Sequence, residues 1–116
     1  MGGSVDLSVQ KQSGVQVIRL RGRLTLGDAV DSFREALEVS MENGNYRIAI
    51  NFSEVPLMDS SGIGVLVRNQ TTAKQLGGAI KLVQPTEFIL KTLKMVGLLN
   101  LFDVYGSEDE AIAAFA

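Results

Sequence analysis

Residues 47–64 read Arg-Ile-Ala-Ile-Asn-Phe-Ser-Glu-Val-Pro-Leu-Met-Asp-Ser-Ser-Gly-Ile-Gly. The first six residues, 47–52, are rich in β-branched, aliphatic and aromatic side chains, and this composition predicts a strand. A short loop follows, and from Ile63 onward apolar side chains recur at helical spacing. A strand joined to a helix by a short loop is the unit from which parallel α/β sheets are built.

Two strands and a helix are expected before this stretch. Alternating apolar residues predict a half-buried strand over residues 5–9, a turn at 12–14 and a second strand over 15–22, together an antiparallel hairpin. A loop then ends at Asp28, which is the expected N-cap of the first helix. The apolar face of that helix is predicted to comprise Val30, Phe33, Leu37 and Met41.

The alternation of helices and strands continues to the C-terminus. We expect a helix over residues 63–76, a strand over 79–83, a third helix capped by Thr86, a strand over 101–105 and a final helix that begins with a capping box at 107–110. The apolar faces predicted for these three helices comprise Ile63, Leu66, Val67, Ala73 and Leu76, then Ile89, Leu90, Leu93 and Val96, then Ala111, Ile112 and Phe115.

Strands that alternate with helices are joined by parallel, right-handed crossovers. The prediction is an α/β fold with a mixed sheet, in which an N-terminal hairpin is followed by parallel βαβ units with about four helices. A single domain is expected over residues 1–116, with a flexible N-terminus at residues 1–4.

The composition excludes several classes of protein. The 116 residues include neither histidine nor cysteine, so Ser-His-Asp and Cys-His nucleophiles, Cys/His zinc sites and disulfides are impossible. The net charge of −2 argues against a nucleic-acid partner, and no apolar run is long enough to span a membrane. We therefore expect a cytoplasmic protein that is not an enzyme, with no cofactor, no metal, no nucleic-acid partner and no membrane insertion.

The candidate functional loop is Met58-Asp59-Ser60-Ser61-Gly62-Ile63-Gly64. It lies between a strand and a helix N-terminus, where parallel-sheet proteins place their ligand sites. A serine at this place can cap the helix, or it can carry a phosphate whose charge the helix end tolerates. On spacing alone capping is the more common role. Gly62-Ile63-Gly64 is too short for a phosphate-binding or dinucleotide-binding loop.

Further motifs accompany this loop, namely Gly22-Arg23-Leu24, the hydrophobic residues on both sides of the loop in 55–65, and a late pattern of Leu90-Lys91-Thr92-Leu93, Gly97-Leu98 and Leu101-Phe102. With the order of elements, they make residues 5–115 resemble the STAS domain, in particular the stand-alone bacterial anti-sigma factor antagonists (anti-anti-sigma factors). The family signature at this junction is Asp-Ser-Ser/Thr-Gly, a hydrophobic residue and Gly.

The resemblance implies a switch in partner binding. In the family, an anti-sigma factor that is itself a serine kinase phosphorylates the serine directly after the aspartate, which here is Ser60. The unphosphorylated antagonist binds this kinase, which then releases its sigma factor. Phosphorylation breaks the complex, and a phosphatase that acts on phospho-Ser60 resets it. The resemblance places Asp59, Ser61 and Gly62 beside Ser60 in the partner-binding surface.

Three flanking residues complete the predicted partner-binding set. Leu57 and Met58 form either an exposed apolar edge for the partner or a loop anchor in the core. Arg23 stands where many family members read Gly-Glu/Asp-Leu-Asp, whereas this chain reads Gly-Arg-Leu-Thr over residues 22–25. Arg23 either pairs with a phosphate on Ser60 or is solvated at a strand end.

Two other functions remain as alternatives. The first is a non-catalytic accessory subunit of a membrane transport system for phospholipids or anions, a role that some STAS relatives have. The second, a small enzyme or nucleotide-binding protein, is disfavoured by the lack of histidine, cysteine and a carboxylate pair. The expected oligomeric state is a monomer or a weak dimer.

Overall fold

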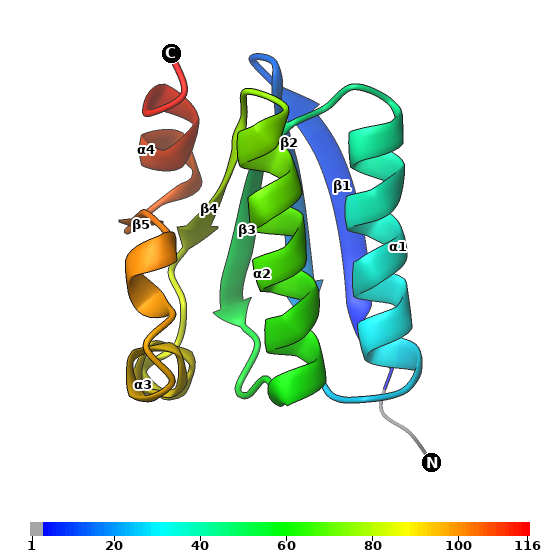
Figure 1. The fold of residues 1–116 in the computed structure, drawn as a ribbon, viewed down its shortest axis with the longest axis vertical. Helices are drawn as coiled ribbons and strands as arrows, with labels where there is room; N and C mark the ends of the chain where they lie inside the picture. Colours follow the sequence, from blue (N-terminus) through cyan, green and yellow to red (C-terminus); the bar gives the residue numbers. More distant parts are fainter. Residues whose placement is uncertain (1–3) are drawn as a thin grey trace.

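A five-stranded sheet forms the centre of the structure, a computed structural model that describes residues 4–116 (Figure 1). The strands lie side by side in chain order and are β1 (Asp6–Gln12), β2 (Val15–Arg21), β3 (Arg47–Glu54), β4 (Ala79–Val83) and β5 (Val104–Tyr105). β1 and β2 are antiparallel, and the other neighbours are parallel. The predicted mixed sheet is therefore confirmed. The predicted flexible terminus lies outside the described residues, except for Ser4.

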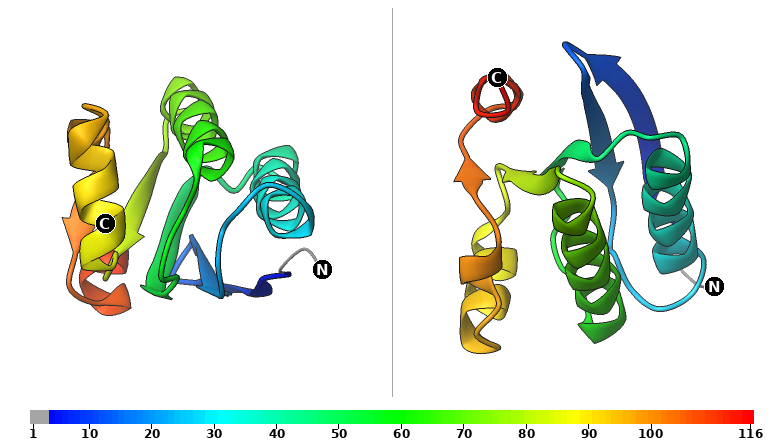
Figure 2. Two further views of the ribbon diagram at one scale, coloured as in Figure 1. Left: turned by 90° about the horizontal axis from the view of Figure 1, so that it is seen from below. Right: turned by 45° about the horizontal axis from the view of Figure 1, so that its top comes forward.

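Helices cover both faces of this sheet. They are α1 (Asp28–Glu42), α2 (Ser60–Gln75), α3 (Glu87–Met95) and α4 (Glu108–Ala113), with a 3₁₀ turn η1 (Leu99–Leu101) before β5. α1 and α2 lie side by side on one face, and α4 lies on the other (Figures 1 and 2). Among residues 4–116, no helix combines the length and the apolar character needed to cross a membrane.

The alternation along β3 builds the main core. Ile48, Ile50 and Phe52 point toward α1 and α2 and are fully buried. The rings of Phe52 and Phe33 meet edge to face with centroids 6.4 Å apart, a favourable aromatic geometry. On the opposite face of β3, Ala49 belongs to a smaller cluster that α4 covers. The predicted apolar face of α1 is buried as expected.

Several predicted boundaries are wrong. β1 runs to Gln12 rather than to residue 9, and α2 begins at Ser60 rather than at residue 63. The N-cap of α1 is Gly27, whose φ of 121° suits glycine, and no side chain caps this helix; Asp28 is its first helical residue. The last strand does not begin at residue 101, because η1 comes first and β5 is only two residues long. Phe102 turns inward after η1 and is 6% exposed, so burial of this ring replaces strand pairing at that point.

Three apolar side chains are more exposed than the periodicity predicts. Leu76 and Val96 are the C-caps of α2 and α3, and both are about half exposed, because each helix ends before its apolar stripe meets the core. Val9 in β1 is 44% exposed. The predicted half-buried first strand is therefore buried mainly at Val5 and partly at Leu7.

The predicted capping box at the start of α4 forms in a modified way. Ser107 accepts a hydrogen bond from the Glu110 N–H, as expected, but the Glu110 carboxylate accepts from the Gly106 N–H rather than from that of Ser107. Glu108 binds Arg19 through two hydrogen bonds of 2.7 and 2.9 Å. The Arg19 guanidinium lowers the pKa of the Glu108 carboxyl, so this ion pair fastens α4 to β2.

Candidate functional site

Two loops that are distant in sequence meet at the carboxyl ends of β2 and β3. Leu24, after β2, forms a parallel bridge with Met58, after β3. The Leu24 N–H donates to the Leu57 carbonyl at 3.0 Å, and the Asp59 N–H donates to the Leu24 carbonyl at 3.2 Å. Parallel strands end at the same edge of a sheet, so this edge brings the loops together at the N-terminus of α2.

Asp59 connects both loops to α2. Its Oδ1 accepts hydrogen bonds from the N–H groups of Ser61 and Gly62 at 3.0 and 3.1 Å, and from the Ser61 hydroxyl at 2.6 Å. Its Oδ2 accepts from the Leu26 N–H at 2.9 Å. These hydrogen bonds, led by that of the Ser61 hydroxyl, lower the pKa of the Asp59 carboxyl because each favours the charged form. Asp59 is thus an ionised N-cap that also holds the loop after β2.

The two adjacent serines have different environments. The Ser61 hydroxyl donates to Asp59, and the residue is partly buried. Ser60 is the first residue of α2 and is exposed, and its hydroxyl takes no hydrogen bond from or to the protein within residues 4–116. A reagent that approaches from solvent therefore meets the Ser60 hydroxyl with no internal bond to break.

Gly62 and Met58 lie inside the site rather than on its surface. Met58 is only 3% exposed, so of its two expected roles the loop anchor applies. A Cβ at residue 62 would lie 2.7 Å from the Met58 Cγ and 3.0 Å from the Leu24 carbonyl oxygen, so only glycine lets α2 approach the loops this closely. Leu57 is half-buried.

The loop after β2 contributes two exposed residues to the site. Arg23 is exposed and directly precedes Leu24. Leu26, which the sequence analysis did not single out, is 76% exposed although its N–H binds Asp59. Leu26 is one of two leucines in this short loop, and Leu24 is the one that is buried. A second large apolar residue in so short a loop is a signal that could have identified Leu26.

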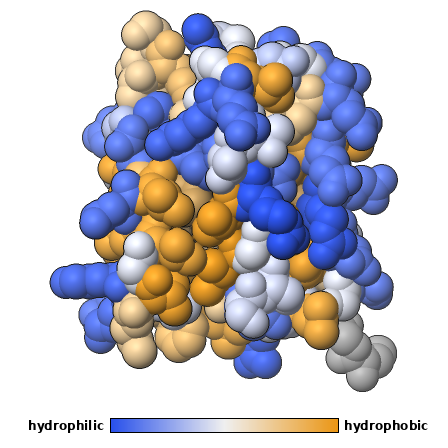
Figure 3. Space-filling view, viewed as in Figure 1, coloured by the Kyte–Doolittle hydropathy of each residue, from blue (hydrophilic) through white to orange (hydrophobic). Residues whose placement is uncertain are grey.

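Helix α3 borders the same site. The hydroxyl of Thr86, the N-cap of α3, donates to the Val55 carbonyl in the loop after β3 at 3.1 Å. α3 exposes the large apolar side chains of Phe88 and Met95, of which Met95 is 86% exposed. Figure 3 shows hydrophobic surface gathered over the half of the molecule that holds α3, whereas the side that holds α1 is mostly hydrophilic. Ser60 thus lies at an end of the molecule that offers apolar surface to a protein.

The Asp59 contacts predict a pH-dependent contribution to stability. Asp59→Ala is expected to lower the free energy of unfolding by about 2 kcal/mol at pH 7, since it removes an N-cap and the bond to Leu26. The folded pKa is lowered, so this contribution is complete above the ordinary aspartate pKa of about 3.9 and is lost as the pH falls through the folded value. Urea unfolding of both proteins between pH 7 and pH 2 measures the difference.

Asp28→Ala is the matched control for that experiment. Asp28 is exposed at the start of α1 and caps nothing, so its removal is expected to cost less than about 1 kcal/mol, the range of a charge near a helix end. Equal losses for the two variants would contradict the role given to Asp59.

Comparison with known proteins shows one family. The family model described as the STAS domain matches residues 6–111. The chain is 24% identical over 110 residues to the anti-sigma F factor antagonist of Paenibacillus polymyxa, covering 94% of this chain and 93% of that protein. It is also 24% identical over 112 residues to the anti-sigma-B factor antagonist of Bacillus subtilis (strain 168), covering 97% and 99%.

Solved structures agree with this result. The Bacillus cell fate determinant SpoIIAA in its phosphorylated form matches with a TM-score of 0.77 and 26% identity over 96% of this chain and all of that one. A sulfate transporter family protein from Wolinella succinogenes, with a TM-score of 0.74 and 21% identity over 87% of this chain and 84% of that one, shares the fold. The site combines the two paired loops with the Asp59 cap and the serine that follows it. The chain that carries this site belongs to the STAS domain family and is similar to anti-sigma factor antagonists.

Proposed function

We propose that this protein is a cytoplasmic anti-sigma factor antagonist that binds a serine-kinase anti-sigma factor and thereby frees a sigma factor. Phosphorylation of Ser60 by that kinase ends the binding, and a phosphatase that acts on phospho-Ser60 restores it. The chain itself needs no catalytic group for this function. The observation that carries the proposal is the exposed, unbonded Ser60 hydroxyl directly beside the Asp59 cap.

The surroundings of Ser60 support a switch by charge. Asp59 is ionised, so a phosphate on Ser60 would add about 1.5 to 2 negative charges next to an existing one. The N-terminus of α2 tolerates such a charge within the domain, so the domain can keep its structure while its outer surface becomes strongly negative. A partner that docks on the neutral form then meets repulsion and a cost of desolvation.

The partner surface is proposed to extend from Ser60 to its exposed neighbours. Leu26, in the loop after β2, and Phe88, in α3, are exposed and supply apolar contact area. Arg23 supplies a cation in place of the acid found in many relatives, and it is the residue from which we expect a difference in the choice of kinase. Met58 and Gly62 support this surface from below, since both are buried.

Phosphorylation by a kinase-type anti-sigma factor tests the proposal. The chain is incubated with the anti-sigma factor encoded beside its gene and with ATP, followed by intact-mass measurement and site mapping. We expect one phosphoryl group, on Ser60, and none on Ser60→Ala. Ser61→Ala is the matched control and should still be phosphorylated, at least to half of the wild-type extent. A phosphate only on Ser61, or none at all, would argue against the proposal.

The transport-subunit alternative has no observation of its own in this chain. Its likeness to a transporter-family structure is one of fold, whereas its sequence matches run over nearly the full length of two antagonists. Co-purification with a membrane transporter, in the absence of any anti-sigma factor binding, would favour the alternative.

A further inference from the structure

Strand β1 leaves the outer edge of the sheet open. Within residues 4–116, β1 pairs only with β2. The pair Gln12 and Val15 flanks a turn made of Ser13 and Gly14, both with positive φ. In such a two-residue hairpin the flanking pair is hydrogen-bonded, and bonded pairs then alternate with non-bonded ones along the ladder. The backbone groups of residues 7, 9 and 11 therefore point outward, away from β2.

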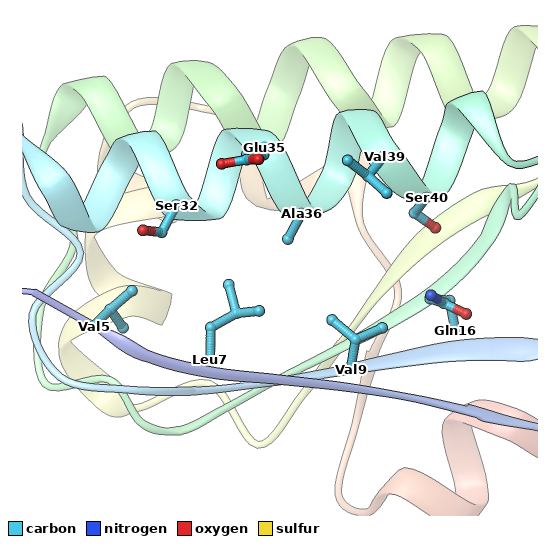
Figure 4. A pocket seen from close by; sticks show the side chains of 9 residues that line it. All are labelled: Val5, Leu7, Val9, Gln16, Ser32, Glu35, Ala36, Val39 and Ser40. Carbon is cyan, nitrogen blue, oxygen red and sulfur yellow. The ribbon is translucent and has the colours of Figure 1, made fainter.

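An apolar groove runs along this open edge. It lies between β1 and α1, has a volume of about 490 Å³, and is lined on the strand side by Val5, Leu7 and Val9 (Figure 4). Ala36 and Val39 face these side chains from α1. The groove thus offers unpaired backbone groups and a row of apolar side chains side by side, which is the combination that recruits an additional strand.

We propose that β1 of a second copy of this chain fills this edge, which makes a two-fold symmetric dimer with one continuous ten-stranded sheet. The pairing is antiparallel and centred on Ser8. This proposal does not depend on the function proposed for Ser60.

The sequence of β1 is self-complementary in this register. Leu7 of one copy lies opposite Val9 of the other, and this pairing occurs twice because of the symmetry. Both residues point their backbone groups outward, so these pairs exchange hydrogen bonds, and both point their side chains toward the helices. A shift by one residue would place polar side chains opposite the apolar ones.

Charge complementarity also favours a second copy over another extended peptide. In this register Lys11 of one copy lies opposite Val5 of the other, and Ser32 is the residue of α1 that lines the groove near Val5 (Figure 4). Glu35 lies over Leu7 rather than over Val5 (Figure 4), so the Lys11 side chain of one copy has to extend from the end of the interface toward its middle to approach the Glu35 carboxylate of the other copy. A single strand with one helix face forms a small contact, so we expect a dimer of the weak, transient class.

Cysteine cross-linking tests the register. The chain has no cysteine, so Ser8→Cys introduces a unique thiol whose two copies face each other across the symmetry axis. Opposite residues of a non-bonded antiparallel pair have Cα atoms roughly 4.5 Å apart, which suits a disulfide. We expect mild oxidation to give a covalent dimer of Ser8→Cys. Gln12→Cys is the matched control, since its two copies would lie roughly 27 Å apart along the strands and should cross-link at least tenfold more slowly.

Sedimentation equilibrium tests the surface without cross-linking. The mass-average molecular mass of the wild-type protein should rise with protein concentration toward twice the 12.5 kDa of one chain. Val9→Lys should shift this rise to at least tenfold higher concentration. Val104→Lys, a valine of nearly equal exposure (42%) on the opposite edge strand, should behave as the wild type. Circular dichroism confirms that both variants fold.

Three outcomes would overturn the proposal. They are a wild type that stays monomeric up to about 1 mM, a dimer that Val104→Lys disrupts while Val9→Lys does not, and equal cross-linking of Ser8→Cys and Gln12→Cys. If the wild type stays monomeric and the amides of β1 are protected from hydrogen exchange only in a complex with another protein, the edge binds an extended peptide of that protein instead of a second copy.

Discussion

Ser60→Asp is expected to weaken binding to the kinase-type anti-sigma factor by at least about 30-fold, or ~2 kcal/mol, because it places a carboxylate at the centre of the docking surface beside the ionised Asp59. The domain itself should not suffer. An acidic residue in the first turn of a helix is stabilising by about 0.3–1 kcal/mol. Titration calorimetry with the purified kinase measures the affinity, and urea unfolding measures the stability.

Ser60→Asn is the matched control for this experiment. It has nearly the size of aspartate and carries no charge, so affinity within about threefold of the wild type is expected if charge is the switch. Equal weakening by Ser60→Asp and Ser60→Asn would mean that bulk at this position ends binding, and undiminished binding of Ser60→Asp would exclude the switch at this residue. Neither variant alters Ser61, whose hydroxyl stays bonded to Asp59.

Gly78→Ala is expected to have the largest effect on stability, a loss of about 3 kcal/mol or more. A Cβ at residue 78 would lie only 2.0 Å from the carbonyl oxygen of Tyr46. That oxygen cannot move aside freely, because it accepts a hydrogen bond of 3.0 Å from the Ala79 N–H. The start of β4 would therefore have to separate from the segment before β3. Urea unfolding monitored by circular dichroism measures the loss.

Gly64→Ala is the contrasting control. A Cβ at residue 64 would meet only Arg68 Nη1, at an ordinary contact distance of 3.5 Å, and the residue lies within α2. Alanine in a helix interior is favoured over glycine by about 0.5–1 kcal/mol, so this variant should be more stable than the wild type. Similar effects of the two substitutions would contradict the close approach at Gly78.

Local patterns were sufficient for most of the fold. The spacing of Val30, Phe33 and Leu37 predicted the buried face of α1, and the run 79–83 predicted β4 with its observed bounds. Such patterns succeed because a side chain's direction in a regular helix or strand depends only on its position in that element. They failed at Asp28, since a glycine with positive φ and an aspartate compete for the same cap and sequence spacing does not decide between them.

Part of the candidate site could likewise be predicted from local sequence patterns, and part of it could not. Its place after β3 and the serine pair follow from the sequence, because a cap cluster and a helix start are local features with a recognisable composition. The expected cap was a serine, whereas the structure caps α2 with Asp59 and begins the helix at Ser60. The contrast between Ser60 and Ser61 required the structure, since it depends on which hydroxyl reaches the Asp59 carboxylate. A shift of one position within the first turn of α2 separates Ser61, whose hydroxyl donates to the Asp59 carboxylate, from Ser60, whose hydroxyl does not.

Contacts between distant segments were visible only in three dimensions. The bond from the Leu26 N–H to Asp59 joins residues that are 33 positions apart, and a parallel bridge joins Leu24 to Met58, both of which are buried. Residue types and local periodicity determined the elements, their order and the functional loop. The parallel packing of β2 against β3 alone decided which loops meet, because backbone pairing at the end of a sheet depends on strand neighbours that no local pattern specifies.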